Sequence, residues 1–287
     1  MMLNKNGNIQ NFIGCDASYT DAKIVIFGAP FDSTTSNRPG ARFAPAAIRN
    51  DSQGIETYSP YQDFDMDVAA IYDAGDLELP FGDPLPALSM IEEAAEQIMA
   101  DGKIPVMLGG EHLLTLGAIA AAHRRYPNLR IIHLDAHTDL REDYLGQKLS
   151  HATVIKRCHD LLGDGKIHQF GIRSGTKEEF EWAKTHVSLQ KFNLDGFAQL
   201  AQSLAETNVP VYFTLDLDVL DPACFPGTGT PEAGGIDFPT LLTAIKSLKQ
   251  LKVVGCDVME LAPNLDTSGI STAIACKILR ELLITML

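Results

Sequence analysis

Short runs rich in Ile, Val, Leu and Phe recur along the chain, and amphipathic segments separate most of them. Each run is apolar on both faces and is bounded by turn residues, which is typical of buried parallel strands. The pattern predicts strands at Lys23–Phe27, Ile104–Leu108, Leu129–Leu134, Ile167–Phe170, Val211–Leu217 and Lys252–Val258.

The segments between these runs carry apolar residues at helical spacing. In the first such segment one face consists of Leu88, Ile91, Ala95, Ile98 and Met99. A turn at Asp101-Gly102 then ends the predicted helix. Further helices are predicted at Leu114–Arg125, Phe197–Glu206, Thr240–Leu248 and Thr272–Leu283. The segments expected to be loops are Asp32–Ala46, Pro60–Pro86 and Pro222–Pro239.

The alternation of strands and helices predicts an α/β fold with a parallel sheet. The chain has no internal repeat, low-complexity tract or linker rich in Pro, Gly or Ser, so we expect residues 1–287 to form a single domain. An eight-stranded barrel is the competing architecture, because periodicity alone does not distinguish it from an open sheet.

Composition narrows the possible functions only a little. Hydrophobic residues make up 45% of the chain and charged residues 21%, an ordinary globular balance. The net charge of −14 argues against a nucleic-acid-binding protein. It fits a cationic or neutral small substrate, and equally a soluble protein kept dispersed by its charge. The five scattered cysteines form neither a disulfide framework nor a zinc cluster.

No targeting or membrane segment is expected. The first residues, Met1–Asn8, lack the apolar core of an export signal. The apolar runs elsewhere are far too short to cross a bilayer. We therefore predict a cytoplasmic protein that does not act at a membrane.

Reactive polar residues follow four of the predicted strands. These segments are Gly109-Gly110-Glu111-His112, Asp135-Ala136-His137-Thr138-Asp139, Asp216-Leu217-Asp218, and Asp257 with Glu260. In parallel α/β folds, ligands bind at the carboxyl ends of the strands. We therefore expect four strands to bring His and carboxylate side chains to one rim.

The spacing of these residues indicates a metal centre. Asp135, His137 and Asp139 alternate along extended backbone and point to one side, and Asp216 and Asp218 repeat the arrangement. Converging carboxylates repel one another unless cations neutralise them. Two divalent ions about 3.5–4 Å apart, bridged by carboxylates, would do so. The candidate ligands are His112, Asp135, His137, Asp139, Asp216 and Asp218.

This mixture of two His and four Asp ligands favours two Mn²⁺ ions per chain, with Ni²⁺, Co²⁺ or Zn²⁺ as less favoured alternatives. A lone Asp-x-Asp is usually only a strand-end cap. Here, however, Asp-x-Asp, Asp-x-His-x-Asp and Gly-Gly-Glu-His each follow an apolar run. His133 lies one layer deeper and is interpreted as a core histidine. The remaining histidines are interpreted as helix or surface residues, namely His123, His159, His168 and His186.

With these motifs in place, the sequence resembles the ureohydrolase family of arginases and agmatinases over nearly its whole length. The third metal segment continues through Asp221-Pro222, Pro226-Gly227 and Gly234-Gly235. The loop Pro39–Pro45 and the segment from Gly255 to Pro263 are also similar to the family's.

The resemblance implies a three-layer α-β-α fold with a mainly parallel eight-stranded sheet, a binuclear manganese centre, and homotrimers or homohexamers. One ion would be bound by His112, Asp135, Asp139 and Asp216. The other would be bound by Asp135, His137, Asp216 and Asp218. Asp135 and Asp216 would then bridge the two ions.

The resemblance also implies hydrolysis of a guanidinium group by a metal-bridging hydroxide. Asp139 would accept a hydrogen bond from this hydroxide and pass its proton to the leaving amine. Glu260 would pair with the guanidinium, and it could otherwise be a strand-end residue in an ion pair. His151 would carry protons near the mouth of the site, although Ala152 stands where many family members have Gly.

Two departures from arginases bear on the substrate. Leu140-Arg141 follows Asp139 where arginases have an Asn-Thr pair, and Ser174-Gly175-Thr176 stands where arginases have acidic residues. Both favour a small guanidino compound without an α-carboxylate, such as agmatine, which would give urea and putrescine. Arginine, guanidinobutyrate, guanidinopropionate and formiminoglutamate remain alternatives, since Arg141 or Arg173 could bind an acidic tail.

Other classes fit less well. A two-metal phosphoesterase would show a phosphate-binding set that the sequence lacks, and a deacetylase-like hydrolase would bind a single zinc. An inactive homologue that serves as a binding subunit is expected to lose a ligand, the shuttle histidine or the guanidinium-binding glutamate. All of these residues are present in the sequence.

Overall fold

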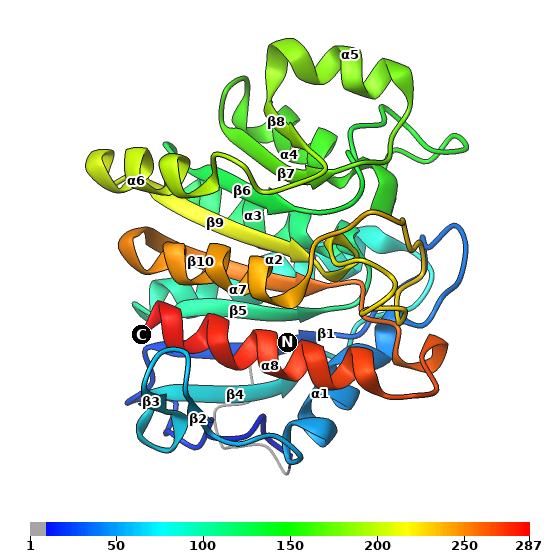
Figure 1. The fold of residues 1–287 in the computed structure, drawn as a ribbon. Helices are drawn as coiled ribbons and strands as arrows, with labels where there is room; N and C mark the ends of the chain where they lie inside the picture. Colours follow the sequence, from blue (N-terminus) through cyan, green and yellow to red (C-terminus); the bar gives the residue numbers. More distant parts are fainter. Residues whose placement is uncertain (1–9) are drawn as a thin grey trace.

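An open sheet of eight parallel strands forms the centre of the protein in a computed structural model that describes residues 10–287 (Figure 1). The strand order is β4-β1-β5-β10-β9-β6-β7-β8. The strands are β1 (Ile24–Ala29), β4 (Ile71–Asp76), β5 (Ile104–Gly109), β6 (Arg130–Leu134), β7 (Ile167–Ile172), β8 (Ser188–Lys191), β9 (Pro210–Asp216) and β10 (Lys252–Met259). A separate antiparallel pair is formed by β2 (Tyr58–Ser59) and β3 (Phe64–Asp65).

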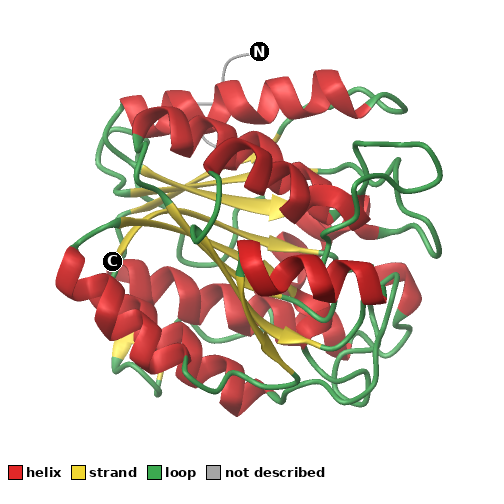
Figure 2. Ribbon diagram, turned by 90° about the horizontal axis from the view of Figure 1, so that it is seen from above, coloured by secondary structure: helices red, strands yellow, loops and turns green. Residues whose placement is uncertain are grey.

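Helices cover both faces of the sheet and give three layers (Figure 2). One face carries α1 (Ala44–Ser52), α6 (Phe197–Thr207), α7 (Phe238–Ser247) and α8 (Ile270–Met286). The other carries α2 (Pro84–Ala100), α3 (Thr115–Arg125), α4 (Val154–Leu162) and α5 (Lys177–His186). Short 3-10 helices are η1 (Ala41–Phe43), η2 (Met66–Val68), η3 (His112–Leu114), η4 (His151–Thr153), η5 (Leu217–Val219), η6 (Leu248–Gln250) and η7 (Pro263–Leu265).

All six predicted strands are present, and the three-layer fold implied by the resemblance is confirmed. The competing barrel is wrong, because β4 and β8 are the two edges of an open sheet.

The prediction of a loop over Pro60–Pro86 is also wrong, since this segment contains β4. Asp73 interrupts the apolar pattern of β4. Its buried carboxylate is compensated by the Arg49 guanidinium at 2.8 and 2.9 Å and by the N–H of Phe12 at 2.9 Å. Because the partners of Asp73 are distant in the chain, the sequence of β4 itself does not show that this strand is buried.

The pattern also missed β8, α1, α4 and α5. The edge strand β8 is short and only partly buried, so its sequence Ser-Leu-Gln-Lys has no apolar run. α1 is short, and its first residues fall in the segment predicted as the loop Asp32–Ala46. The starts of two helices were also predicted too late, since α2 begins at Pro84 and α7 at Phe238, both inside segments predicted as loops. Asp83 and Asp237 cap these helices, and Pro84 and Pro239 stand in their first turns.

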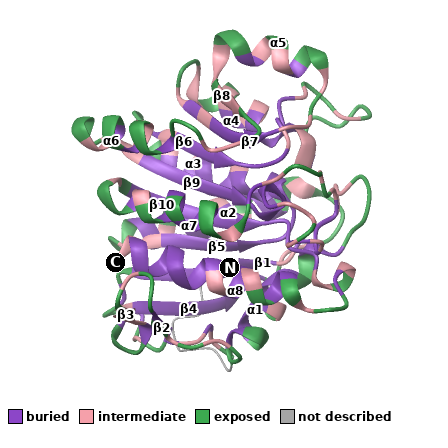
Figure 3. Ribbon diagram, in the orientation of Figure 1, coloured by how far each residue is buried: buried purple, intermediate pink, exposed green. Residues whose placement is uncertain are grey.

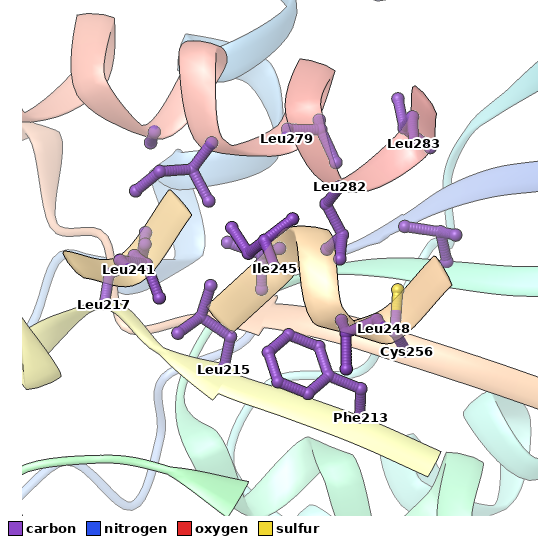
Figure 4. Close-up of a cluster of buried hydrophobic side chains, with 14 of the residues drawn as sticks. Phe213, Leu215, Leu217, Leu241, Ile245, Leu248, Cys256, Leu279, Leu282 and Leu283 are labelled. Atoms are coloured by element: carbon purple, nitrogen blue, oxygen red, sulfur yellow. The ribbon is translucent and has the colours of Figure 1, made fainter. Parts of the chain in front are cut away.

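The middle of the sheet is buried on both faces, and exposed residues lie in the loops and on the outer sides of the helices (Figure 3). Phe213 and Leu215 of β9 pack with Ile245 of α7 and with Leu279 and Leu282 of α8 (Figure 4). This packing fixes the middle strands of the sheet, whose carboxyl ends carry the site described below.

Replacing Leu279 with Ala should lower the free energy of unfolding by about 2–5 kcal/mol, because a fully buried side chain is lost and a cavity remains. Urea denaturation of the two proteins measures this difference. The exposed Leu161 is a matched control, and Leu161→Ala should change stability by less than about 0.5 kcal/mol. Equal stability of the Leu279 variant and the unsubstituted protein would contradict this description of the core.

Within residues 10–287, no helix combines the length and the apolar character needed to span a membrane. The segment Met1–Asn8, whose sequence lacks the apolar core of an export signal, lies outside the described residues. The single-domain organisation stays a prediction from the sequence.

Candidate metal centre and active-site pocket

Four neighbouring strands deliver the candidate residues to one rim of the sheet. β5, β10, β9 and β6 lie side by side in this order, and each leads at its carboxyl end into one of the segments identified in the sequence. Together they line a pocket of about 280 Å³. Its walls include His112, His137, Asp139, His151, Asp216, Asp218 and Glu260.

His112 is the centre of the first group of side chains. Its Nδ1 lies 3.1 Å from Asp135 Oδ2, 3.2 Å from Asp216 Oδ2 and 3.6 Å from Asp139 Oδ2. All four residues are buried. Atoms about 3 Å apart can share one ion at metal–ligand distances of about 2.1 Å.

His137 is the centre of the second group. Its Nδ1 lies 2.9 Å from Asp218 Oδ2 and 3.4 Å from Asp135 Oδ1. Asp135 therefore offers one oxygen to each group, as a carboxylate that bridges two ions would. The two sets of potential ligands share this residue: His112, His133, Asp135 and Asp139 form one, and Asp135, His137 and Asp218 form the other.

Two buried atoms show that these groups fit metal ions. Within residues 10–287, neither His112 Nδ1 nor Asp218 Oδ2 makes a hydrogen bond of proper geometry with its neighbours, although both atoms are shielded from solvent. A buried polar atom without a partner costs about 1–3 kcal/mol. Since nearby carboxylates repel one another as well, cations at both positions would remove both penalties. The arrangement is a site for two divalent metal ions.

Two residues of the site have strained backbone. Asp139 and Glu260 have φ angles of 52° and 65°, values that residues other than glycine rarely adopt. Each such residue costs on the order of 1–3 kcal/mol and persists only where its surroundings impose it. Both side chains line the pocket, which is consistent with a functional role for these conformations.

Gly110 makes the turn at the end of β5 possible. A Cβ on this residue would lie 1.9 Å from the backbone oxygen of Phe31. The Gly110 carbonyl accepts a hydrogen bond from the Glu260 N–H at 3.0 Å, so the ends of β5 and β10 are joined. The Gly-Gly sequence thus allows His112 and Glu260 to approach each other.

His133 is a core histidine, as interpreted from the sequence, but it also touches the metal centre. It is fully buried, and its Nε2 donates to Asp135 Oδ2 at 2.8 Å. Its Nδ1 accepts a hydrogen bond from Gln169 Nε2 at 3.0 Å, and this assigns the proton to Nε2. Burial lowers the pKa of His133, so the ring is neutral. The His133–Gln169 pair orients Asp135.

A second supporting contact fixes the ring of His112. Thr214 Oγ1 on β9 lies 2.8 Å from His112 Nε2, so the opposite nitrogen, Nδ1, points into the site. Hydrogen bonding of the outer nitrogen orients metal-binding histidines in this way. Thr214 lies two residues before Asp216, but only the placement of β9 two strands away from β5 reveals this contact.

Glu260 lies beside the metal groups and is 5% exposed. Its Oε1 accepts a hydrogen bond from the His112 N–H at 2.7 Å. Burial raises the pKa of Glu260 to about 8. A cation bound beside this carboxyl group would favour its charged form.

His151 lies at the mouth of the pocket in the first turn of η4. The Ser36 N–H donates to His151 Nε2 at 3.2 Å, and Ser36 Oγ is 2.9 Å from the same nitrogen. Burial, with a smaller contribution from His137, lowers the pKa of His151 to about 4. The imidazole is therefore neutral at physiological pH.

Glu111 supports His151 from a distance, which the sequence did not indicate. Its carboxyl oxygens accept hydrogen bonds from the N–H and hydroxyl of Thr34 at 2.8 and 2.6 Å. Thr34 Oγ1 in turn accepts from the His151 N–H at 3.1 Å. Glu111 thereby ties the loop of residues 32–36 to the pocket mouth.

The two arginines considered as tail-binding groups have different surroundings. Arg173 donates to the backbone carbonyls of Gly171, Asp218, Val219, Leu220 and Glu232, so its guanidinium holds two loops together. Arg141 lies at the pocket, where it stacks over Tyr144 at 4.5 Å and lies 3.5 Å from Glu179 Oε2. Its charge is thus already paired.

Known proteins resemble the chain in both sequence and fold. A sequence profile of the arginase family matches residues 22–285. The agmatinase of Bacillus anthracis is 47% identical over 276 residues, which is 95% of each chain. The N(1)-aminopropylagmatine ureohydrolase of Thermococcus kodakarensis is 40% identical and covers 84% of this chain and 83% of its own. The solved agmatine ureohydrolase of Thermoplasma volcanium superposes with a TM-score of 0.88 at 35% identity, covering 98% and 95%.

The fold and the two-metal site define a ureohydrolase-type enzyme, and the chain belongs to the arginase family. The family resemblance predicted from the sequence is therefore confirmed.

Proposed function

We propose that this protein hydrolyses agmatine to urea and putrescine at a centre of two Mn²⁺ ions. The observation that carries the proposal is the convergence of six ligand residues at the ends of neighbouring strands, where His112 Nδ1 and Asp218 Oδ2 lack partners. The agmatinases among the relatives support the choice of agmatine.

The ligands divide into two overlapping sets. His112, Asp135, Asp139 and Asp216 would hold one ion, and Asp135, His137, Asp216 and Asp218 would hold the other. When bound, two such ions lower the pKa of water in the site and supply a nucleophile near neutral pH. Carboxylates with imidazole suit Mn²⁺, the ion we propose.

Substrate binding and proton transfer would fall to three other side chains, those of Glu260, Asp139 and His151. Glu260 would hold the planar guanidinium through charge-assisted hydrogen bonds and so align its carbon for attack. Asp139 would accept a proton from the attacking water and transfer it to the leaving amine. His151, neutral and located at the mouth, would exchange protons between the pocket and solvent.

The environment of the pocket beyond Asp139 favours a substrate without an α-carboxylate. Leu140 is 4% exposed and offers no side-chain hydrogen bond to such a group. Arg141 is paired with Glu179, and Arg173 is engaged by backbone carbonyls. Both guanidinium groups thus already have partners within the protein, which disfavours a substrate with a carboxylate tail such as arginine or guanidinobutyrate.

Urea release from a panel of substrates tests this choice. The Mn²⁺-loaded protein should release urea from agmatine with a kcat/KM at least about tenfold above that for arginine, guanidinobutyrate or guanidinopropionate. A higher kcat/KM for N(1)-aminopropylagmatine than for agmatine would support guanidinium hydrolysis but contradict agmatine as the preferred substrate. Formiminoglutamate contains no guanidinium group and so requires a separate assay of formamide release. Activity on this compound alone would contradict the proposal.

Replacing His151 with Asn should lower kcat for agmatine by about 10²-fold, because a positioned proton carrier contributes roughly that much. Steady-state kinetics measures the effect, and added imidazole should restore part of the rate. His123→Asn on α3, outside the pocket, serves as the control and should behave like the unsubstituted protein. An unchanged kcat in the His151 variant would exclude the assigned role.

We further propose that the protein is cytoplasmic and assembles into homotrimers or homohexamers, as the family resemblance implies. Sedimentation of the purified protein measures its assembly state. A monomer at assay concentrations would contradict the proposed assembly.

A further inference from the structure

Three side chains far from the pocket converge at the surface between α4 and α5. His159 lies on α4, Asp164 lies in the loop to β7, and His186 is the last residue of α5. Asp164 Oδ1 accepts hydrogen bonds from His159 Nε2 at 2.8 Å and from His186 Nδ1 at 2.6 Å. The three potential ligand atoms lie within 4.8 Å of one another. In Figure 1 the two helices lie beside β7 and β8 at one end of the sheet.

The loop that carries Asp164 is shaped to place it there. Gly163 and Gly165 on either side have φ angles of 83° and 68°, which glycine adopts without strain. The Gly165 N–H donates to the carbonyl of His186 at 2.9 Å and ties the loop to the end of α5. Backbone geometry thus holds the carboxylate between the two imidazoles.

Trp182 fixes the imidazole rings. It stacks on His186 with ring centroids 4.2 Å apart, and it meets the edge of His159 at 4.6 Å. Among the described residues, His159 Nδ1 has no hydrogen-bond partner, so Nε2 is the nitrogen that this ring uses. Rings held in place in this way lose little freedom when they bind an ion.

We propose that His159, Asp164 and His186 form a second, peripheral metal site that binds one Zn²⁺ per chain. Two imidazoles and one carboxylate are a common ligand set for Zn²⁺ with water in the fourth position. Because His-rich sets favour Zn²⁺ over Mn²⁺, this site differs in preference from the carboxylate-rich centre. Asp164 is exposed, with 64% of its side chain accessible, so an ion can reach the site from solvent.

The proposed zinc site would link two helices, α4 and α5. α4 starts directly after η4, which contains His151, and the first turn of α5 contains Glu179, which bonds the hydroxyl of Thr138 at 2.6 Å. An ion bound to His159 and His186 would join the opposite ends of these two helices. Zn²⁺ would therefore brace α5, whose first turn lines the pocket through Glu179, against α4, which follows the pocket residues His151 and Ala152.

Zinc content after equilibrium dialysis tests the proposal directly. The Mn²⁺-loaded protein should retain one more Zn²⁺ per chain than Asp164→Ala or His186→Ala, at free Zn²⁺ buffered in the micromolar range. His123→Ala, which removes a histidine outside the cluster, should retain as much Zn²⁺ as the unsubstituted protein. Replacement of Mn²⁺ by Zn²⁺ at the main centre should be the same in all four proteins. It therefore does not affect the difference in zinc content between them.

Trp182 supplies an independent readout, because it is the only tryptophan in the chain. Co²⁺ bound beside it should quench its fluorescence and saturate at one ion per chain, and this quenching should be lost in Asp164→Ala. Equal zinc content in the cluster variants and the unsubstituted protein, or identical quenching in Asp164→Ala, would overturn the proposal. Neither readout depends on agmatine hydrolysis, so failure of this site and failure of the proposed function are distinguishable.

Discussion

Asp135→Asn should lower kcat for urea release by more than about 10³-fold, which corresponds to about 4 kcal/mol of transition-state stabilisation. Asp135 faces both groups of ligands, with Oδ2 3.1 Å from His112 and Oδ1 3.4 Å from His137. Asparagine keeps the size but loses the charge that two cations require. Steady-state kinetics with saturating Mn²⁺, together with the metal content of the purified variant, measures the effect.

A matched control is Asp195→Asn on the loop before α6, where the carboxylate accepts a hydrogen bond from Asn193 and lies outside the pocket. This variant should keep its full activity and metal content. An Asp135 variant with two bound ions and normal turnover would show that the bridging role assigned to this residue is wrong.

Glu260→Gln should lower kcat/KM for agmatine by about 10²–10³-fold with the fold intact. The amide oxygen can still accept from the His112 N–H, which Glu260 binds at 2.7 Å, so the local structure is retained. What is lost is the negative charge opposite the guanidinium, and with it charge-assisted pairing and alignment.

The kinetics should separate this loss from an effect on the metals. Metal content should equal that of the unsubstituted protein, whereas Glu206→Gln on the exposed side of α6 should change neither metal content nor kcat/KM. A Glu260 variant with unchanged kcat/KM would mean that the guanidinium binds elsewhere in the pocket.

The candidate ligands could be predicted from sequence because each follows a strongly apolar strand. Parallel strands bring their carboxyl ends to one rim, and the segments after β5, β9 and β6 meet there because these strands and β10 stand together in the middle of the sheet. The extended backbone assumed for the spaced residues does not hold throughout, because Asp139 has a left-handed φ of 52° and Asp218 lies in the 3-10 helix η5. The positions after the strands, more than the alternation, therefore brought the candidate ligands together.

The supporting contacts could not be predicted, because their partners are distant in sequence. Nothing near His133 indicates that Gln169 on the next strand fixes its proton, and nothing near Glu111 indicates that it binds Thr34. Strand β4 was missed for the same reason, since Arg49 on α1 compensates Asp73. Such pairs depend on tertiary packing and leave no periodic signal.

His159 and His186 illustrate a different difficulty. From its sequence neighbours alone, each of these residues was interpreted as a helix or surface histidine. Only the turn at Gly163 and Gly165, with the hydrogen bond from Gly165 to His186, brings Asp164 between them. The cluster thus depends on how α4, its following loop and α5 are arranged.

The most direct test of a two-metal ureohydrolase is a titration of the metal-free protein with Mn²⁺ while urea release from agmatine is measured. The proposed centre predicts no activity without metal and a rise that reaches its plateau at two equivalents per chain. A plateau at one equivalent, or urea released by the metal-free protein, would contradict it.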